Sequence, residues 1–368
     1  MRSIFAAIAL LISAAPFCHA VPQTPADAII IPTEICRDYF LVPITLAPRA
    51  NSPANRTLWF LYDTGATEAY IDPSSVKRAS GVNVKTGENA AIRNATIGPV
   101  KINKMQAKVR SLDHISRALG REIDGILPYG TFRDFLLTLD YQHGEMRLTK
   151  GELPQPDDQS VFVTKGPDKR PWLSIEFPNR KRRMLIDSGA ATSGLVVKKL
   201  KRYPTTAAPV VIGAAFRLKK IEMRSGARLM GNARIGPFEL VRPTLESTPG
   251  TELIGGEVLN RFNWTFDQKN KRVQIVQFDP ETAITFEPII THGMVLEIHK
   301  KGFRIKAIVP QTPAENADLK KGDVVTHWNG EPVGERGCRE EDKEFLHLKL
   351  LRGTEEHEVE VALFSLVD

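Results

Sequence analysis

The most regular feature of the hydrophobic pattern is a pair of apolar hairpins, and each of them ends on a carboxylate. In both, an alternating strand and a short polar turn lead into an apolar run, and the residues that follow are Asp63 and Asp187. The paired strands are Phe40–Leu46 with Arg56–Tyr62 and Trp172–Phe177 with Arg183–Ile186, with turns at 48–53 and 178–180. Because an apolar strand that ends in Asp risks the cost of desolvating a charge, two such endings indicate that the carboxylates serve a function there.

The chain repeats itself around these two carboxylates. The run Phe60–Thr67 reads FLYDTGAT and the run Met184–Ala191 reads MLIDSGAA. Three further blocks recur in the same order: Ala95–Val100 as Ala233–Phe238, Asp124–Tyr129 as Glu252–Gly256, and Phe132–Tyr141 as Leu259–Asp267. This pattern predicts a mainly β protein with two duplicated β lobes, at 29–152 and 170–280, joined by a linker at 153–169.

Equivalent strand ends bring two carboxylates together if the two copies pack face to face. Two carboxylates within hydrogen-bond reach cannot both ionise cheaply, so they share one proton and titrate as a pair with widely separated pKa values. The ionised member can take a proton from water while the protonated member polarises a carbonyl group. Such a pair hydrolyses a peptide bond without a covalent intermediate.

On these residues the chain resembles the aspartic proteases. Asp63-Thr64-Gly65 and Asp187-Ser188-Gly189 are similar to the paired Asp-Thr/Ser-Gly motifs of that family, and the short lobes look most like the retropepsin-like type found in bacteria. The resemblance implies a catalytic dyad of Asp63 and Asp187, a polypeptide substrate and no cofactor. Because one chain carries both motifs, a monomer is sufficient, although the linker is long enough for a dimer of chains.

The resemblance also implies roles for the neighbours of each Asp. Gly65 and Gly189 let the backbone approach the carboxylates and offer them amide hydrogens. Thr64 and Ser188 are expected to hydrogen-bond across the interface between the lobes. Pro128 departs from the pattern, because it stands where the second lobe has a glycine, and it has no amide hydrogen to donate. The intervals 88–94 and 218–227 fall where the family has a flap hairpin.

The C-terminal region, residues 286–368, resembles a bacterial PDZ domain with an α+β fold, and the run Val309–Gly330 carries this resemblance. Gly293-Met294-Val295-Leu296 stands where that family binds a chain-terminal carboxylate. The resemblance implies a C-terminal peptide ligand that adds as a strand to the sheet edge, or a regulatory role. A second interpretation follows, in which the lobes are an inactive scaffold and the protein binds peptides through this domain.

The N-terminal segment predicts that the protein is exported. Residues 1–20 read as a secretory signal, with Arg2, an apolar core at 4–15 and the cleavage site Cys18-His19-Ala20, and a Pro-rich lead-in follows at 21–28. A periplasmic or secreted protein is expected, without a stable membrane span, since no apolar stretch has the length of one. After cleavage, Cys36 and Cys338 remain, and the sequence leaves open whether they are free or form a disulfide.

The charge and composition of the chain limit the kinds of partner that it is expected to bind. The 368 residues carry a formal charge of +7 and have a pI near 9.2, but acidic and basic residues are mixed throughout and no basic run is interleaved with aromatics. No nucleic-acid partner is therefore expected. The eight His residues show no metal-ligand spacing, so no metal site is expected either.

Overall fold

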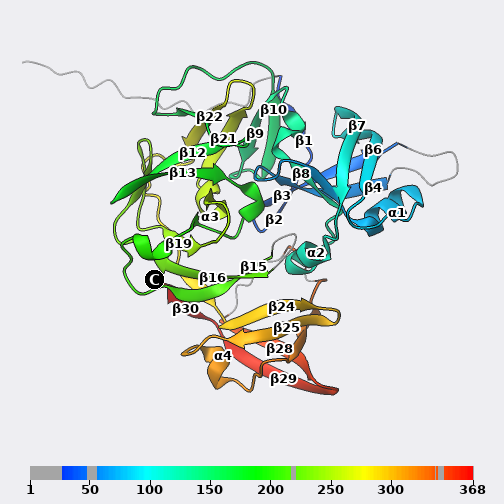
Figure 1. Cartoon of the computed structure of the whole chain (residues 1–368), viewed down its shortest axis with the longest axis vertical. Helices are drawn as coiled ribbons and strands as arrows, with labels where there is room; N and C mark the ends of the chain where they lie inside the picture. The colour runs from blue at the N-terminus through cyan, green and yellow to red at the C-terminus, as the bar shows by residue number, and fades with distance from the viewer. Residues whose placement is uncertain (1–26, 48–55, 217–220, 336, 339–343, 368) are drawn as a thin grey trace, which may run out of the picture.

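The computed structural model describes residues 27–47, 56–216, 221–335, 337–338 and 344–367, and the expected signal segment lies outside them. The chain is mainly β, which confirms the expected fold class. Figure 1 shows two β-rich lobes side by side and a smaller C-terminal domain packed beneath them. No helix in the described part of the chain is long and apolar enough to cross a membrane.

The first lobe is built on the hairpin that was expected to deliver Asp63. Its two strands pair antiparallel, and the second continues through Asp63, which lies beside Pro128 in a parallel pairing with β8. The sheet order is β2-β3-β4-β8-β5-β7-β6. The elements are β2 (Glu34–Cys36), β3 (Tyr39–Leu46), β4 (Arg56–Asp63), β5 (Ala69–Ile71), α1 (Pro73–Ser80), β6 (Asn89–Ile97), β7 (Val100–Val109), α2 (Asp113–Leu119), β8 (Gly125–Pro128) and η1 (Tyr129–Phe132).

The second lobe repeats the pairing pattern of the first. Its delivering strand β13 pairs parallel with β20, and β14 pairs antiparallel with β20, as β4 and β5 do with β8. The sheet order is β15-β16-β19-β14-β20-β13-β12-β17-β18. The elements are β12 (Trp172–Phe177), β13 (Arg180–Ile186), η2 (Ser188–Ala190), β14 (Leu195–Val197), η3 (Leu200–Arg202), β15 (Val210–Phe216), β16 (Ile221–Arg228), β17 (Ala233–Ile235), β18 (Phe238–Leu240), β19 (Thr244–Ser247), β20 (Leu253–Ile254) and α3 (Gly256–Leu259).

The two copies differ after the strand that follows each Asp. In the first lobe Asp72 caps α1 by accepting a hydrogen bond of 2.8 Å from the Ser74 amide, as its position in the sequence predicts. In the second lobe Lys199 stands at the corresponding start and supplies no side-chain cap, and only the 3-10 turn η3 forms. A short helix without a cap has little intrinsic stability, which accounts for the difference.

A third sheet joins the lobes, in the order β1-β10-β9-β21-β22-β11. Its central pair is β9 with β21, where Thr138 Oγ1 and Thr265 Oγ1 lie 2.9 Å apart. These two threonines occupy equivalent positions of the repeat, so the copies meet about an approximate two-fold axis. The segment expected as a linker contains β11, which pairs with β22 and is part of this sheet. The strands are β1 (Ile29–Ile31), β9 (Leu136–Asp140), β10 (Glu145–Thr149), β11 (Val161–Val163), β21 (Phe262–Asp267) and β22 (Arg272–Gln277).

The C-terminal domain has its own sheet, β24-β25-β26-β28-β29, and its own buried core around Ile305, Val325 and Leu348. Its edge strand β24 lies beside β15 of the second lobe (Figure 1). Arg228 of the second lobe, which is buried, donates hydrogen bonds to the carbonyl oxygens of Glu287 and Val367. The elements are β23 (Ile289–Thr291), β24 (Met294–His299), β25 (Gly302–Ile308), α4 (Pro313–Asn316), β26 (Val324–Trp328), β27 (Glu331–Pro332), β28 (Phe345–Arg352), β29 (Glu355–Ala362) and β30 (Phe364–Val367).

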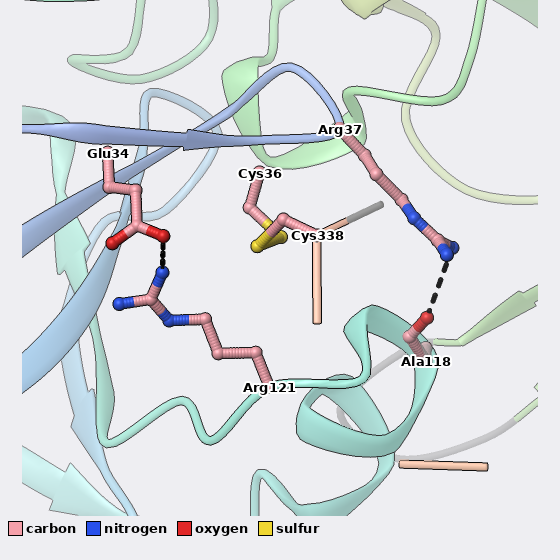
Figure 2. The surroundings of a disulfide bond; sticks show 6 residues. All are labelled: Glu34, Cys36, Arg37, Ala118, Arg121 and Cys338. Atoms are coloured by element: carbon pink, nitrogen blue, oxygen red, sulfur yellow. Dashed lines mark hydrogen bonds and ion pairs between the residues drawn. A yellow bond between two sulfur atoms is a disulfide. The ribbon is translucent and has the colours of Figure 1, made fainter. Parts of the chain in front are cut away.

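A disulfide also connects this domain to the first lobe. Cys36 and Cys338 are bonded, with 4.7 Å between their Cα atoms and 302 positions between them in the sequence (Figure 2). Of the two alternatives that the sequence leaves open, the structure therefore contains the disulfide.

Candidate functional site

The two lobes bring Asp63 and Asp187 face to face. Each Asp follows a buried strand, and each lies against the glycine of the other motif: a Cβ on Gly65 would lie 2.5 Å from Asp187 Oδ1, and a Cβ on Gly189 would lie 2.5 Å from Asp63 Cγ. Only a residue without Cβ fits at either glycine, so the two glycines are what allow the carboxyl groups to approach each other.

The same glycines orient the carboxyl groups. The amide of Gly65 donates a hydrogen bond of 2.7 Å to Asp63 Oδ1, and the amide of Gly189 donates one of 3.0 Å to Asp187 Oδ1. Because both loops use the same contact, the two carboxyl groups are held in equivalent orientations.

Thr64 and Ser188 lock the two loops together through a buried, reciprocal set of hydrogen bonds. The Thr64 hydroxyl donates to the Ile186 carbonyl at 2.8 Å and accepts from the Ser188 amide at 2.9 Å. The Ser188 hydroxyl donates to the Tyr62 carbonyl and accepts from the Thr64 amide, both at 3.0 Å. Neither side chain is exposed to solvent, so these bonds are made out of reach of water and couple the lobes directly.

We expect Thr64→Val to destabilise the protein by roughly 2 to 4 kcal/mol, because valine leaves the Ser188 amide and the Ile186 carbonyl buried without their partner. Urea unfolding of the variant beside the parent measures this effect. Thr57→Val is the matched control, since Thr57 is an exposed threonine on the same strand. Equal unfolding midpoints for the two variants would contradict the role assigned to the Thr64 hydroxyl.

The environment favours one proton on the pair. The pKa of Asp63 is raised well above its ordinary value, first by burial and then by the charge of Asp187, and the Gly65 amide offsets this only in part. Asp187 is 9% exposed, whereas Asp63 keeps a partly open side. The arrangement can therefore hold one acid and one base next to each other, with access from the side of Asp63.

Pro128 is accommodated at the end of β8. Its backbone is extended, with φ −78° and ψ 162°, and the following amide, that of Tyr129, donates to the Ala66 carbonyl at 3.2 Å. At the equivalent position the amide of Gly255 donates to the Gly194 carbonyl at 2.9 Å. Proline has no amide hydrogen for a bond equivalent to that of Gly255, whereas the Tyr129 amide bonds to a different acceptor, Ala66, in the loop that follows Asp63.

A cavity of about 300 Å³ opens beside Asp63, and both lobes line it. One side comes from β4, β8 and α2 of the first lobe, and the other from the loop after Asp187 and from β14, β16 and β20. Its lining residues are Arg37, Tyr39, Leu61, Asp63, Ile115, Ala118, Leu119, Ile126, Gly189, Ala190, Thr192, Ser193, Val196, Arg224 and Leu253. A larger hollow of about 630 Å³ along β7 contains neither aspartate, so the chemistry belongs to the smaller one.

Two polar residues of this cavity were missed by sequence reasoning. Tyr39 is one of them, and burial together with the charge of Asp187 raises its pKa to about 12. Arg224 forms an ion pair with Glu246 and donates a hydrogen bond of 2.8 Å to Ser193 Oγ. Neither residue lies in a repeated block, so only their positions in space identify them.

Arg170 is a further residue without a sequence signal. Its guanidinium donates a hydrogen bond of 2.8 Å to the Gly65 carbonyl and pairs with Asp168. Arg170 therefore connects the segment before the second lobe to the loop that carries Asp63. Nothing in the local sequence distinguishes it from other surface arginines.

The two intervals expected as flaps have different structures. Residues 88–94 of the first lobe lead into and form part of β6, which is paired with β7 within the sheet. Residues 221–227 belong to β16, in a hairpin with β15, and residues 218–220 lie outside the described residues. Both intervals thus contain strands of antiparallel hairpins, and of the two strands β16 supplies a residue, Arg224, to the cavity.

The run Gly293-Met294-Val295-Leu296 makes internal contacts. The amide of Gly293 donates to Thr291 Oγ1 at 3.2 Å, and the amide of Met294 donates to His292 Nδ1 at 2.9 Å. Val295 and Leu296 pair with β25. A peptide strand that adds to β24 would therefore use its other edge, which lies beside β15.

No group of His, Cys, Asp or Glu side chains suited to a metal ion occurs among the residues that the structure describes.

Comparisons with known proteins give little overlap. No family model matches the chain, and no curated protein matches it. Among solved structures, the chain is similar to a PDZ domain protein from Parabacteroides distasonis ATCC 8503, with 24% identity over 21% of this chain and 20% of that chain and a TM-score of 0.20. At this TM-score the likeness assigns neither a fold nor an activity.

Proposed function

We propose that this chain is an aspartic-type endopeptidase that hydrolyses peptide bonds with Asp63, Asp187 and an activated water. The observation that carries the proposal is the pair of facing carboxyl groups, each held by the glycine of its own motif and packed on the glycine of the other. Both groups come from one chain, which supports a monomer as the active form.

In the proposed reaction the two carboxyl groups share one proton. The ionised member accepts a proton from water as the water oxygen attacks the peptide carbonyl carbon, and the protonated member donates its proton to the carbonyl oxygen. The resulting tetrahedral intermediate collapses as the amine leaves with a proton from one carboxyl group, and a hydroxyl of the intermediate returns a proton to the other, which restores the singly protonated pair. The glycine amides and the Thr64–Ser188 bonds keep the carboxyl groups in place, so little reorganisation accompanies the proton transfers.

Cleavage of an unfolded protein between acidic and near-neutral pH tests the proposal. Activity should follow a bell shape, because the pair has no base when both members are protonated and no acid when both are ionised. Since burial and Asp187 raise the pKa of Asp63 well above its ordinary value, the alkaline limb should lie well above pH 4, and activity should fall as the pH rises through that raised value. A parent without activity at any pH would favour the second interpretation, an inactive scaffold whose C-terminal domain binds peptides.

We also propose that the mature chain is periplasmic or secreted. The Cys36–Cys338 disulfide supports this, because such bonds persist in oxidising compartments. The N-terminal sequence of the exported protein is expected to start at Val21, after the cleavage site at 18–20. A chain that stays in the cytosolic fraction with its first residues intact would contradict export.

A further inference from the structure

The helix α2 forms one wall of the cavity beside Asp63. Ile115, Ala118 and Leu119 of this helix line the cavity. The helix has seven residues and no side-chain N-cap bond, and a helix this short is not stable on its own. The contacts that α2 makes with the rest of the molecule therefore decide whether the wall keeps its position.

Two of these contacts come from the C-terminal domain. Arg117 donates hydrogen bonds to the carbonyl oxygens of His299 at 2.8 Å and Lys300 at 3.2 Å, in the turn between β24 and β25. The amide of Gly337 donates a hydrogen bond of 2.8 Å to the carbonyl of Gly120, the residue that ends α2. The cavity wall is thus attached at two places to a domain that contributes no residue to the cavity lining.

The disulfide lies between α2 and the β2–β3 turn, which supplies the adjoining wall. Cys36 is fully buried and is followed by Arg37, whose guanidinium donates to the Ala118 carbonyl at 3.4 Å (Figure 2). On the other side of the bond, Arg121 at the end of α2 forms an ion pair with Glu34 of β2 (Figure 2). The buried side chains packed with Cys36 are Leu41, Leu61, Leu112, Leu119, Ile123 and Ile126, and three of them line the cavity.

We propose that the Cys36–Cys338 disulfide positions the substrate pocket: through residues 337 and 338 the C-terminal domain holds α2 and the β2–β3 turn in place as the walls of the cavity beside Asp63. This inference rests on the proposed function, since it assigns the cavity to substrate. The bond acts on substrate binding and leaves the acid–base pair intact, because the glycine amides that orient Asp63 and Asp187 belong to their own motifs and not to α2 or the disulfide.

Reduction by a dithiol releases this restraint. A thiolate of the reductant attacks Cys338 Sγ, which is partly exposed, and displaces the Cys36 thiolate, which takes up a proton. The second thiol of the reductant then closes a cyclic disulfide and releases the Cys338 thiol. In balance, the dithiol loses two electrons and two protons and the protein disulfide becomes two thiols. A link between positions 302 apart is lost, and with it the restraint on the two pocket walls.

The test compares the oxidised full-length parent, the parent treated with dithiothreitol, and Cys338→Ala. Hydrogen exchange of the amides of residues 113–119 is expected to accelerate at least about tenfold in both perturbed samples. In peptide cleavage, KM is expected to rise at least about threefold while kcat stays within about twofold.

Arg304→Ala is the control for the domain, since Arg304 is in the same C-terminal sheet and faces Glu297. Cys338→Ala treated with dithiothreitol is the control for the reductant.

Unchanged exchange of residues 113–119 after reduction and in Cys338→Ala would overturn the proposal, whatever the activity. A fall in kcat with constant KM would overturn it as well, because the bond would then act on the carboxyl pair. A parent that cleaves nothing would refute only the proposed protease activity, and the exchange data alone would then decide whether the disulfide holds the walls of the cavity.

Discussion

We expect Asp63→Asn and Asp187→Asn each to lower the cleavage rate of an unfolded protein by roughly 10³-fold or more. An amide can neither take a proton from water nor share one with the remaining carboxyl group, so either replacement removes one half of the acid–base pair. The rate of peptide bond cleavage, measured at the optimum pH of the parent, is the observable. Loss of activity in only one of the two variants would contradict a shared dyad within one chain.

The same variants should not lose stability at neutral pH, and this separates a catalytic role from a structural one. Because the pKa of Asp63 is raised in the folded state, the stability that its proton contributes is present in full below the ordinary pKa of Asp and is lost as the pH rises through the raised value. Asp63→Asn removes a buried carboxyl group whose ionised form is disfavoured beside Asp187, so near pH 7 its melting temperature should equal or exceed that of the parent.

The matched control for this pair is Asp134→Asn. The Asp134 side chain is 72% exposed, forms an ion pair with Lys269 and is not part of the cavity lining. The same chemical exchange there should change cleavage less than about twofold. A comparable loss of activity in Asp134→Asn would show that the assay responds to something other than the facing carboxyl groups.

Gly189→Ala should reduce cleavage roughly 100-fold or more, because a methyl group there has to displace a catalytic carboxyl group. The added Cβ would lie 2.5 Å from Asp63 Cγ and 2.6 Å from each carboxyl oxygen. The backbone of Gly189 is not in the left-handed region, so the effect arises from crowding alone. Overpacking of this kind should also cost about 1 to 3 kcal/mol of stability.

Gly130→Ala is the matched control, because it makes the same substitution at a position where a methyl group meets no neighbouring atom. No heavy atom lies within 4 Å of a Cβ at Gly130, and its backbone is also outside the left-handed region. This variant should keep the cleavage rate and the melting temperature of the parent. If both alanine variants cleave at the parental rate, the carboxyl group of Asp63 does not need the position that the structure assigns to it.

The parts of the fold and site that could be predicted from the sequence are those whose local sequence pattern occurs in both copies of the repeat. Alternation in Trp172–Phe177 predicts β12 with the bounds that the structure has. The facing carboxyl groups and the Thr64–Ser188 contacts could be anticipated because each residue recurs in the repeat, and equivalent residues meet at an approximate two-fold axis.

The features that could not be predicted depend on contacts between residues that are far apart in the sequence. Tyr39, Arg170 and Arg224 reach the site from segments whose local sequence carries no signal, and only the packing of both lobes brings them there. Residues 153–169 were expected to serve as a linker, and Val161–Val163 within them adds to the edge of the shared sheet, since open backbone groups of β22 favour another strand. Cysteine spacing alone does not determine which cysteines pair, so the disulfide could be identified only from the structure.

The disulfide has one more consequence, for a chain that has been cut. The backbone connects the second lobe to the C-terminal domain only once, along residues 278–288, which are mostly exposed. A single proteolytic cut in this stretch would leave two polypeptides, and the Cys36–Cys338 bond would still join them. The nicked protein would then migrate as one species without reductant and as two with it. The cut therefore breaks the backbone between the domains, but the disulfide keeps them in one covalently linked molecule.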